Sequence, residues 1–192
     1  TAEFKRKTRE TDIAAKINLD GTGSSMIGTG IPFVDHMLEL FSKHSLIDVR
    51  LKARGDLEVD YHHTVEDAGI VLGTVLDRAL GTRRGINRYG DAAVPMDDAL
   101  SRVAVDLGGR PWLSYSIANR KKKIRDFDLG LIEEFFRALV VPARMNLHID
   151  QVAGKDPHHA YESVFKAVGR AMRQACARDP GTRGVPSSKG RL

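Results

Sequence analysis

Two copies of one five-residue pattern constrain the fold of this chain more than any other feature of its sequence. The pattern is His-His-x-x-Glu, and it occupies residues 62–66 and 158–162. The copies lie 96 positions apart in a chain of 192 residues, and each opens a segment with the periodicity of an amphipathic helix. The spacing therefore predicts two fused halves, each with the same helix at the same place.

The spacing inside the pattern is typical of metal ligands on a helix. Residues three and four positions apart share a helical face, so Glu66 is expected beside both His62 and His63. Adjacent residues project about 100° apart, so the two histidines are expected to serve different ions. Because one turn supplies too few donors for a stable site, the other repeat is the expected source of the rest. A solvated helix start is the alternative, and the duplication argues against it.

Length and composition allow an ordinary hydrophobic core. A chain of 192 residues with 42% hydrophobic residues suits one large domain or two smaller ones, and the duplication favours repeats at 1–92 and 93–180 with a C-terminal tail at 181–192. The single cysteine, Cys176, argues against a disulfide framework and for a reducing compartment. No membrane-length apolar run or secretory segment is present. We expect a soluble cytoplasmic protein, although Thr1 in place of Met leaves a removed leader open.

The charge balance predicts anionic partners. The net charge is +5 and the pI about 9.4, which fits nucleic acid or phosphorylated small molecules. Basic residues gather at 83–88, 120–125 and 183–191, and the second run is expected to be an exposed loop. Aromatic residues make up 6% and do not interleave with these clusters, so a stacking surface for single-stranded nucleic acid has little support.

Periodicity and turn residues predict a similar order of elements in both halves. Strands are expected at 4–9, 13–18, near 26 and at 47–52, with a hairpin at Asp20-Gly21, and helices from Pro32 onward and at 62–80. The second half gives strands at 100–107, 112–117 and 145–151 and helices at 129–140 and 158–177. Aligning the first helices makes His36 and Glu134 equivalent, 98 positions apart. Each half then offers four donors, and eight donors suit two ions with four ligands each.

Other polar residues are weaker candidates. His44 stands near the C-terminal end of the first helix, where a cation is favoured, and His148 lies in a strand pattern. Asp97 and Asp98 are paired carboxylates, but neighbours in a strand point to opposite sides. At most one of these two aspartates is therefore expected to face the site.

Six segments together resemble the imidazoleglycerol-phosphate dehydratase family of histidine biosynthesis, and the resemblance covers nearly the whole chain. They are GIPFVDHML (30–38), DYHHTVED (60–67), GINRYG (85–90), GRP (109–111), AGKDPHH (153–159) and PSSKG (186–190). The resemblance implies an α+β fold of two duplicated halves, each a four-stranded sheet packed with two helices, like ribosomal S5 domain 2. It also implies a homo-oligomer of 24 subunits with two Mn²⁺ ions per site. The implied reaction removes water from D-erythro-imidazoleglycerol phosphate to give imidazole-acetol phosphate.

The resemblance also implies site residues. The implied metal ligands are His36, His62, His63, Glu66, Glu134, His158, His159 and Glu162. Glu134 departs from the family, which often has a histidine there, but a carboxylate is a suitable ligand for Mn²⁺. The candidate catalytic carboxylates are Glu10, as general acid/base, with Glu66 and Glu162. The candidates for contact with substrate or its phosphate are Glu10, His36, His44, Arg88, Arg110, Lys166, Ser187, Ser188 and Lys189.

The implied reaction suits a two-metal site. The proton that the dehydration removes is bound to a carbon atom next to the imidazole ring of the substrate. Two cations on the ring nitrogens would therefore help the ring to expel hydroxide. Because adjacent histidines diverge, each site is expected to combine residues of different subunits.

Two other functions stay open. A metal-storage protein would need no phosphate site, and a nucleic-acid-binding module would fit the pI but not buried metal ligands.

Overall fold

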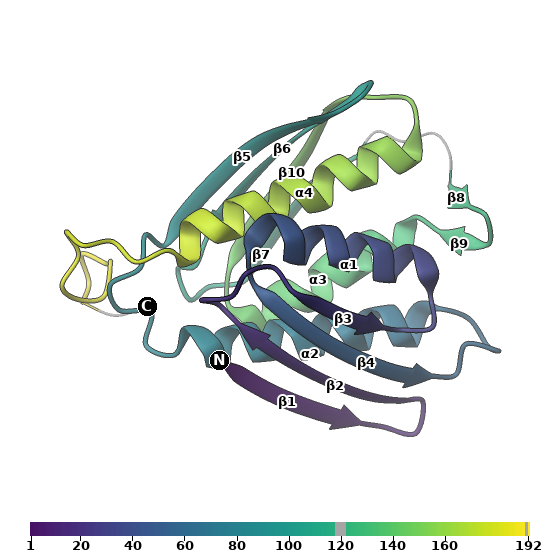
Figure 1. The fold of residues 1–192 in the computed structure, drawn as a ribbon, viewed down its shortest axis with the longest axis horizontal. Helices are drawn as coiled ribbons and strands as arrows, with labels where there is room; N and C mark the ends of the chain where they lie inside the picture. The colour runs from purple at the N-terminus through teal and green to yellow at the C-terminus, as the bar shows by residue number, and fades with distance from the viewer. Residues whose placement is uncertain (118–121, 191) are drawn as a thin grey trace.

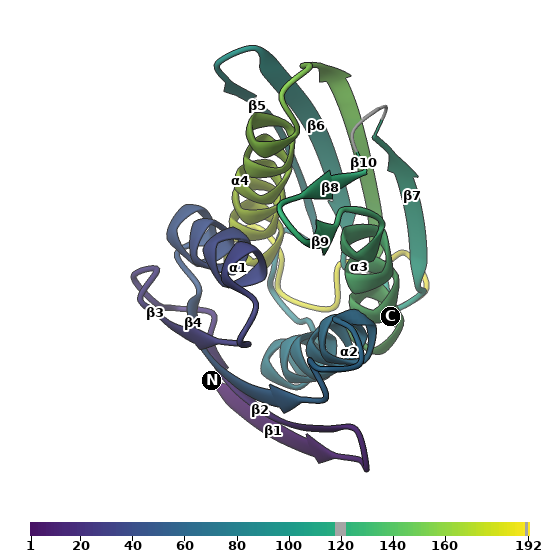
Figure 2. The ribbon, with the colours of Figure 1, turned by 90° about the vertical axis from the view of Figure 1, so that its right-hand side faces the viewer.

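The structure, a computed structural model, describes residues 1–117, 122–190 and 192. Four helices form a layer between two four-stranded sheets (Figure 1, Figure 2). The first half comprises β1 (Ala2–Lys7), β2 (Thr11–Asn18), β3 (Ser25–Gly28), α1 (Pro32–Ser45), β4 (Asp48–Gly55) and α2 (His62–Leu80). The second half comprises β5 (Tyr89–Met96), β6 (Ala99–Asp106), β7 (Trp112–Ser116), β8 (Lys123–Ile124), β9 (Phe127–Asp128), α3 (Gly130–Ala143), β10 (Asn146–Ala153) and α4 (Pro157–Cys176).

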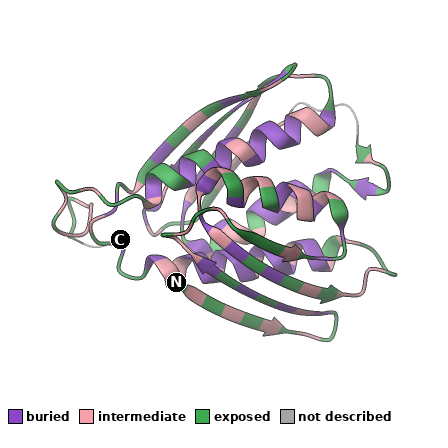
Figure 3. Cartoon of the chain, viewed as in Figure 1, coloured by how far each residue is buried: buried purple, intermediate pink, exposed green. Residues whose placement is uncertain are grey.

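The two sheets have the same topology. Their strand orders are β1-β2-β4-β3 and β5-β6-β10-β7, and in each sheet the last pair is parallel while the others are antiparallel. Buried and exposed positions alternate along the strands, so each sheet turns one face to the helices and the other outward (Figure 3). Ile13, Ile17 and Val103 are among the buried residues that pack against the helices. The sheets thus confirm the expected α+β fold.

The duplication extends to the helix ends. Pro32 and Gly130, which open α1 and α3, are 98 positions apart, and so are the closing residues Ser45 and Ala143. Both helices end on a left-handed residue at equivalent places, at Leu46 and Arg144. This register agrees with the predicted equivalence of His36 and Glu134.

The helices pair between the halves and not within them. α1 packs on α4, and α3 packs on α2. Gly169 of α4 lies so close to Phe41 of α1 that an added Cβ would be 2.9 Å from its carbonyl oxygen, and Gly73 of α2 faces the Leu139 carbonyl of α3 in the same way. The first helix of each half therefore lies beside the second helix of the other half, so donors from both halves come close together.

The predicted strand connections needed correction. Asp20-Gly21 does not close a hairpin, because β3 pairs in parallel with β4 after the α1 crossover and has no contact with β2 in the sheet. β7 likewise pairs with β10 and not with β6. β5 and the β8–β9 hairpin were not predicted, and a repeat boundary at residue 92 would fall inside β5.

The basic runs also differ from expectation. Residues 122–125 are mostly exposed and lead into the β8–β9 hairpin, while Arg120 and Lys121 lie outside the described residues. Arg83 is buried and donates to the carbonyl oxygens of Leu107, Ala143 and Arg144, so it joins elements together and offers no anion site. In the described part of the chain, no helix has the length and apolar character needed to cross a membrane.

Candidate active site

Three predicted ligands meet where α1 lies against the start of α4. His36 Nε2 and His158 Nε2 lie 3.0 and 3.1 Å from Glu162 Oε1. The two imidazole rings stack at 5.7 Å between centroids. Asp156 fixes the start of α4, because its side chain accepts the backbone N–H groups of His158 and His159. One donor atom from each of the three ligands lies within 4.8 Å of the others, a set that fits a transition-metal ion.

Glu162 is held as an anion between the histidines and a lysine. Burial would raise the pKa of its carboxyl group, but hydrogen bonds from Lys166, His36 and His158 and the charge of Lys166 lower it to about 2. Lys166 Nζ lies 2.6 Å from Oε2, on the side away from the imidazoles. Lys166, predicted as a phosphate ligand, is thus placed beside the ligand cluster.

The second histidine of each copy points to a different set of carboxylates. His63 Nδ1 lies 3.0 Å from Asp56, and His159 Nδ1 lies 2.9 Å from Asp98. Hydrogen bonds to these aspartates raise the pKa of both imidazoles. A carboxylate on Nδ1 is the usual support of an imidazole that binds metal through Nε2. Asp56 was not predicted as a site residue, although it stands only seven residues before His63.

Both members of the Asp97-Asp98 pair contact His159, which corrects the expectation that at most one would face the site. Asp98 Oδ1 lies 2.9 Å from Nδ1 and Asp97 Oδ2 lies 3.5 Å from Nε2. The two residues form the turn between β5 and β6, where Asp97 has φ of +46°. The strand rule of alternating sides does not apply in a turn.

The first copy of the pattern is more open than the second. His62 Nε2 and Glu66 Oε2 are 3.9 Å apart, and both side chains are almost half exposed. Glu134 reaches Arg137 on its own helix at 3.7 Å. Among the described residues, His36, His158 and Glu162 form the one group of three donors close enough to share an ion. The two halves therefore do not build equal clusters within one chain.

Glu10 lies in the turn between β1 and β2, next to the first copy of the pattern. Its Oε1 atom is 4.0 Å from Nε2 of His63, and its side chain is 54% exposed. This turn corresponds to the Asp97-Asp98 turn of the second half, which approaches His159 in the same manner. Glu10 is thus free to reach a ligand bound beside His63.

His44 and His148 lie apart from the ligand cluster. Burial, followed by the charges of Lys166, Arg170 and Lys43, lowers the pKa of His44. The expected stabilisation of a cation at this helix end is therefore outweighed. His148 is exposed on the outer face of the second sheet, beside Asp150 and Arg102 in a shallow hollow.

The predicted phosphate ligands gather where the C-terminal tail folds back on the second half. Arg88 donates from Nε and a terminal nitrogen to Asp106 at 2.7 and 3.0 Å, and from its other terminal nitrogen to the carbonyl oxygen of Pro186 at 2.8 Å. The hydrogen bond with Asp106 raises the pKa of Arg88. Within the described part of the chain, the other two of its five N–H donors have no hydrogen-bond partner and could face an anion. Asp106, which holds this arginine, was not identified from the sequence.

The remaining members of this group are open to solvent. Arg110, Ser188 and Lys189 are exposed, and Ser187, in the middle of the tail, is partly buried. The Ser187 hydroxyl accepts the backbone N–H of Lys189 at 3.2 Å, which bends the tail. Together with Arg88 they form the phosphate end, a name used below for Arg88, Arg110, Ser187, Ser188 and Lys189.

The ligand cluster and the phosphate end lie at opposite ends of the molecule. The cluster occupies the first turns of α4, whereas the tail begins after its last residue (Figure 1). A helix of 20 residues is roughly 30 Å long. A small molecule cannot touch both ends of the same chain.

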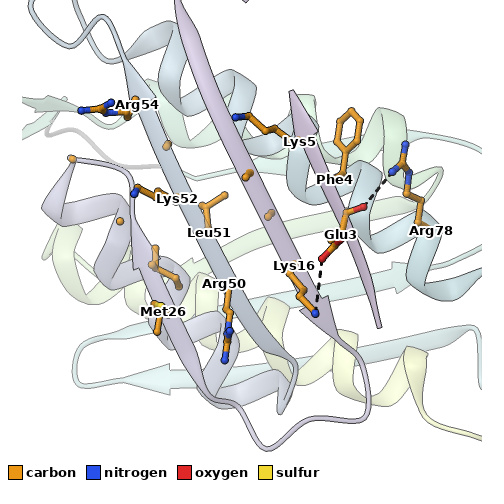
Figure 4. Close-up of a pocket in the computed structure, with 16 residues that line it drawn as sticks. Glu3, Phe4, Lys5, Lys16, Met26, Arg50, Leu51, Lys52, Arg54 and Arg78 are labelled. Atoms are coloured by element: carbon orange, nitrogen blue, oxygen red, sulfur yellow. Dashed lines mark hydrogen bonds and ion pairs between the residues drawn. The ribbon is translucent and has the colours of Figure 1, made fainter. Parts of the chain in front are cut away.

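A broad hollow on the outer face of the first sheet contains none of the candidate residues (Figure 4). Arg50, Lys52 and Arg54 line it from β4, at alternate positions that share one face of the sheet. This face carries part of the positive charge seen in the sequence, but it lies away from the ligand cluster.

Comparisons with known proteins agree with the resemblance found in the sequence. A family model described as "Imidazoleglycerol-phosphate dehydratase" matches residues 29–172. Proteins of that name from Methylorubrum extorquens and Pelotomaculum thermopropionicum are 51% and 54% identical, over 100% of this chain and 99% and 98% of theirs. The crystal structure of the Staphylococcus aureus enzyme matches with a TM-score of 0.81 and 39% identity, covering 92% of this chain and 99% of that one. The Pyrococcus furiosus structure matches with a TM-score of 0.83 and 35% identity, covering 98% and 100%.

Proposed function

Because this chain belongs to the imidazoleglycerol-phosphate dehydratase family, we propose that it converts D-erythro-imidazoleglycerol phosphate into imidazole-acetol phosphate at a site with two Mn²⁺ ions. The observation that carries the proposal is the cluster of His36, His158 and Glu162, which has the donors a transition-metal ion requires. The phosphate end would bind the substrate phosphate, and a metal-storage protein would not need such a site.

The proposed ligands follow from the packing of the helices. His36, His158 and Glu162 would hold one ion, and His62, Glu66 and Glu134 would contribute to the other. His63 and His159, each fixed at Nδ1 by an aspartate, would offer Nε2 to ions held by another chain. When bound, the two ions would polarise the imidazole ring of the substrate as Lewis acids.

The other residues would position the substrate and move its proton. Glu10, exposed beside His63, would take or return the carbon-bound proton as general acid/base. Lys166 stabilises the ionised form of Glu162, and the side chains of Glu66 and Glu162 would offer oxygen ligands to the ions. Arg88 and Arg110 would bind the phosphate with Ser187, Ser188 and Lys189. His44 is partly buried beside Lys166. It would lie at the edge of the bound substrate and would not bind a metal ion.

The separation of the two ends supports a site shared between chains. From Glu162 to the last residue of α4, Cys176, the helix rises roughly 21 Å, and the C-terminal tail follows beyond that end. A homo-oligomer of 24 subunits, the assembly proposed from the family resemblance, would bring the cluster of one chain to the tail of another. We further propose a cytoplasmic enzyme of histidine biosynthesis, in line with the single unpaired Cys176.

The proposal is tested by turnover of imidazoleglycerol phosphate by the purified protein. Activity should vanish after exhaustive chelation and return when Mn²⁺ is restored. Turnover that survives complete removal of metal would reject the two-metal mechanism. A protein that binds Mn²⁺ but shows no turnover would reject the dehydratase function.

A further inference from the structure

The two halves differ where their metal ligands correspond. The repeat relates α1 to α3 at 98 positions and the two His-His-x-x-Glu copies at 96 positions. His36 therefore corresponds to Glu134. Lys166, four residues after Glu162, corresponds to Ile70. Two related ion positions are thus built from different side chains.

The position formed by His36, His158 and Glu162, here named the imidazole-rich centre, offers two nitrogen donors and one carboxylate. Lys166 lies 2.6 Å from that carboxylate and offsets its charge. Affinity for imidazole donors rises along the first-row divalent ions, so Co²⁺ and Zn²⁺ bind such sites more tightly than Mn²⁺ does.

By the repeat, the corresponding position would combine His62 with Glu66 and Glu134, and it is here named the carboxylate-rich centre. It has one nitrogen donor and two carboxylates, and Ile70 brings no cation where the other half has Lys166. Carboxylate oxygens suit Mn²⁺ and Mg²⁺. Replacing an imidazole by a carboxylate therefore reduces the preference for Co²⁺ over Mn²⁺.

The two centres also differ in how far they are formed within one chain. The donors of the imidazole-rich centre already lie within 4.8 Å of one another. At the other centre His62 and Glu66 are 3.9 Å apart, but Glu134 lies 3.7 Å from the Arg137 guanidinium. Arg137 corresponds to Glu39 in α1, so the first half has no such competitor. An ion at the carboxylate-rich centre must draw Glu134 away from Arg137.

We propose that the two ion positions of this protein have different metal selectivity and that Glu134 sets the difference. The imidazole-rich centre prefers Co²⁺ or Zn²⁺, and the carboxylate-rich centre retains Mn²⁺ when those ions compete. The inference rests on the proposed two-metal site and adds that its two ions are unequal.

The test is displacement of Mn²⁺ by Co²⁺ from the full-length protein loaded with Mn²⁺. Released Mn²⁺ is followed by electron paramagnetic resonance, which requires no substrate and no turnover. Two phases of equal size are expected, and the second should need Co²⁺ concentrations higher on the order of 10-fold. A single phase from protein holding two Mn²⁺ per chain would overturn the inference and leave the proposed function standing. Fewer than two Mn²⁺ per chain before Co²⁺ is added would overturn both.

Variants of α3 show which ion position releases its Mn²⁺ in the second phase, here called the late phase. Glu134→His should move it toward the early phase, because both centres then have two imidazoles. Glu133→His is the matched control, since it places a histidine at the neighbouring position, where Glu133 pairs with Arg137 at 2.7 Å. That control should keep two phases. Two phases unchanged in Glu134→His would overturn the inference.

Arg137→Gln provides an independent variant at an exposed position, in case Glu134→His does not assemble. Loss of the guanidinium frees Glu134, so the late phase should require still more Co²⁺ while the early phase stays in place. If Arg137→Gln shifts the early phase instead, the assignment of Glu134 to the late-released ion is wrong.

Discussion

Glu162 makes more side-chain hydrogen bonds than either histidine of the ligand cluster. Its two carboxylate oxygens face different partners, with His36 and His158 near Oε1 and Lys166 near Oε2. A neutral amide at this position would keep the shape and lose the charge that attracts a cation. A change of Glu162 to glutamine therefore tests the charge of this side chain without changing how it packs.

Glu162→Gln should lower the affinity for one of the two proposed Mn²⁺ ions by about 10–100-fold or more, as typically follows a change close to a metal. The measurement is the Mn²⁺ content per chain after dialysis. Glu39→Gln, an exposed carboxylate on α1, should retain both ions. Full Mn²⁺ content in Glu162→Gln would contradict the ligand assignment.

Asp48 holds the loop that leads to β3. Its Oδ1 atom accepts the backbone N–H groups of Thr22 and Ser24 at 2.8 and 2.9 Å. These hydrogen bonds lower the pKa of Asp48 in the folded state below its ordinary value of 3.8. The stabilisation is therefore present above the unfolded-state pKa and is lost as the pH falls through the folded-state pKa.

Asp48→Asn should accordingly destabilise the protein at pH 6, and the difference from wild type should shrink below about pH 4. Urea unfolding midpoints at pH 6 and pH 3, measured on metal-free protein, give the comparison. A difference that stays constant or grows on acidification would contradict this account of Asp48.

Pairing of α1 with α4 is the element-scale feature that creates the ligand cluster. An added Cβ at Gly169 would lie 2.9 Å from the Phe41 carbonyl oxygen and 3.1 Å from His44 Cβ. Both contacts belong to the helix that carries His36. The distance between these helices therefore depends on the absence of a side chain at position 169.

Gly169→Ala should destabilise the protein by about 1–3 kcal/mol, the usual cost of overpacking. It should also weaken Mn²⁺ binding, because α1 must shift and carries His36 with it. Gly28→Ala is the control, since nothing lies within 4 Å of the added Cβ. Chemical denaturation without metal and Mn²⁺ titration measure the two effects. Unchanged stability in Gly169→Ala would mean that the helices are not in close contact.

The helices were predicted correctly because periodicity and capping are local properties. The prediction of a helix at 62–80 matches α2, and α4 begins at Pro157 after the Asp156 cap. β5 was missed because Gly90 and Pro95 make its sequence resemble a loop. As an edge strand it tolerates a proline, and Gly90 allows close approach to the Ala171 carbonyl.

Donor types could be predicted from the sequence, but their grouping could not. His36, His158 and Glu162 were all identified as candidate ligands. Their meeting depends on α1 crossing to the other half, which no local pattern encodes. Supporting groups such as Asp56 and Asp106 were missed for the same reason, because their partners are fixed by the tertiary structure.

The proposed dehydratase site needs two ends of the molecule that lie far apart in one chain. The ligand cluster lies at the start of α4, and the phosphate end follows its last turn. A single chain has both parts but cannot bring them to one substrate. We therefore expect the dehydratase site to combine the metal centre of one chain with the phosphate end of another.

Complementation between two inactive variants tests this claim most directly. Glu162→Gln damages the metal centre and Lys189→Ala damages the phosphate end, so each variant alone should have little turnover of imidazoleglycerol phosphate. Mixed assemblies, obtained by co-expression with different tags and purified through both, should regain about a quarter of the wild-type rate, because random mixing leaves that fraction of sites with both parts intact. Turnover no higher than that of the separate variants would contradict the shared site.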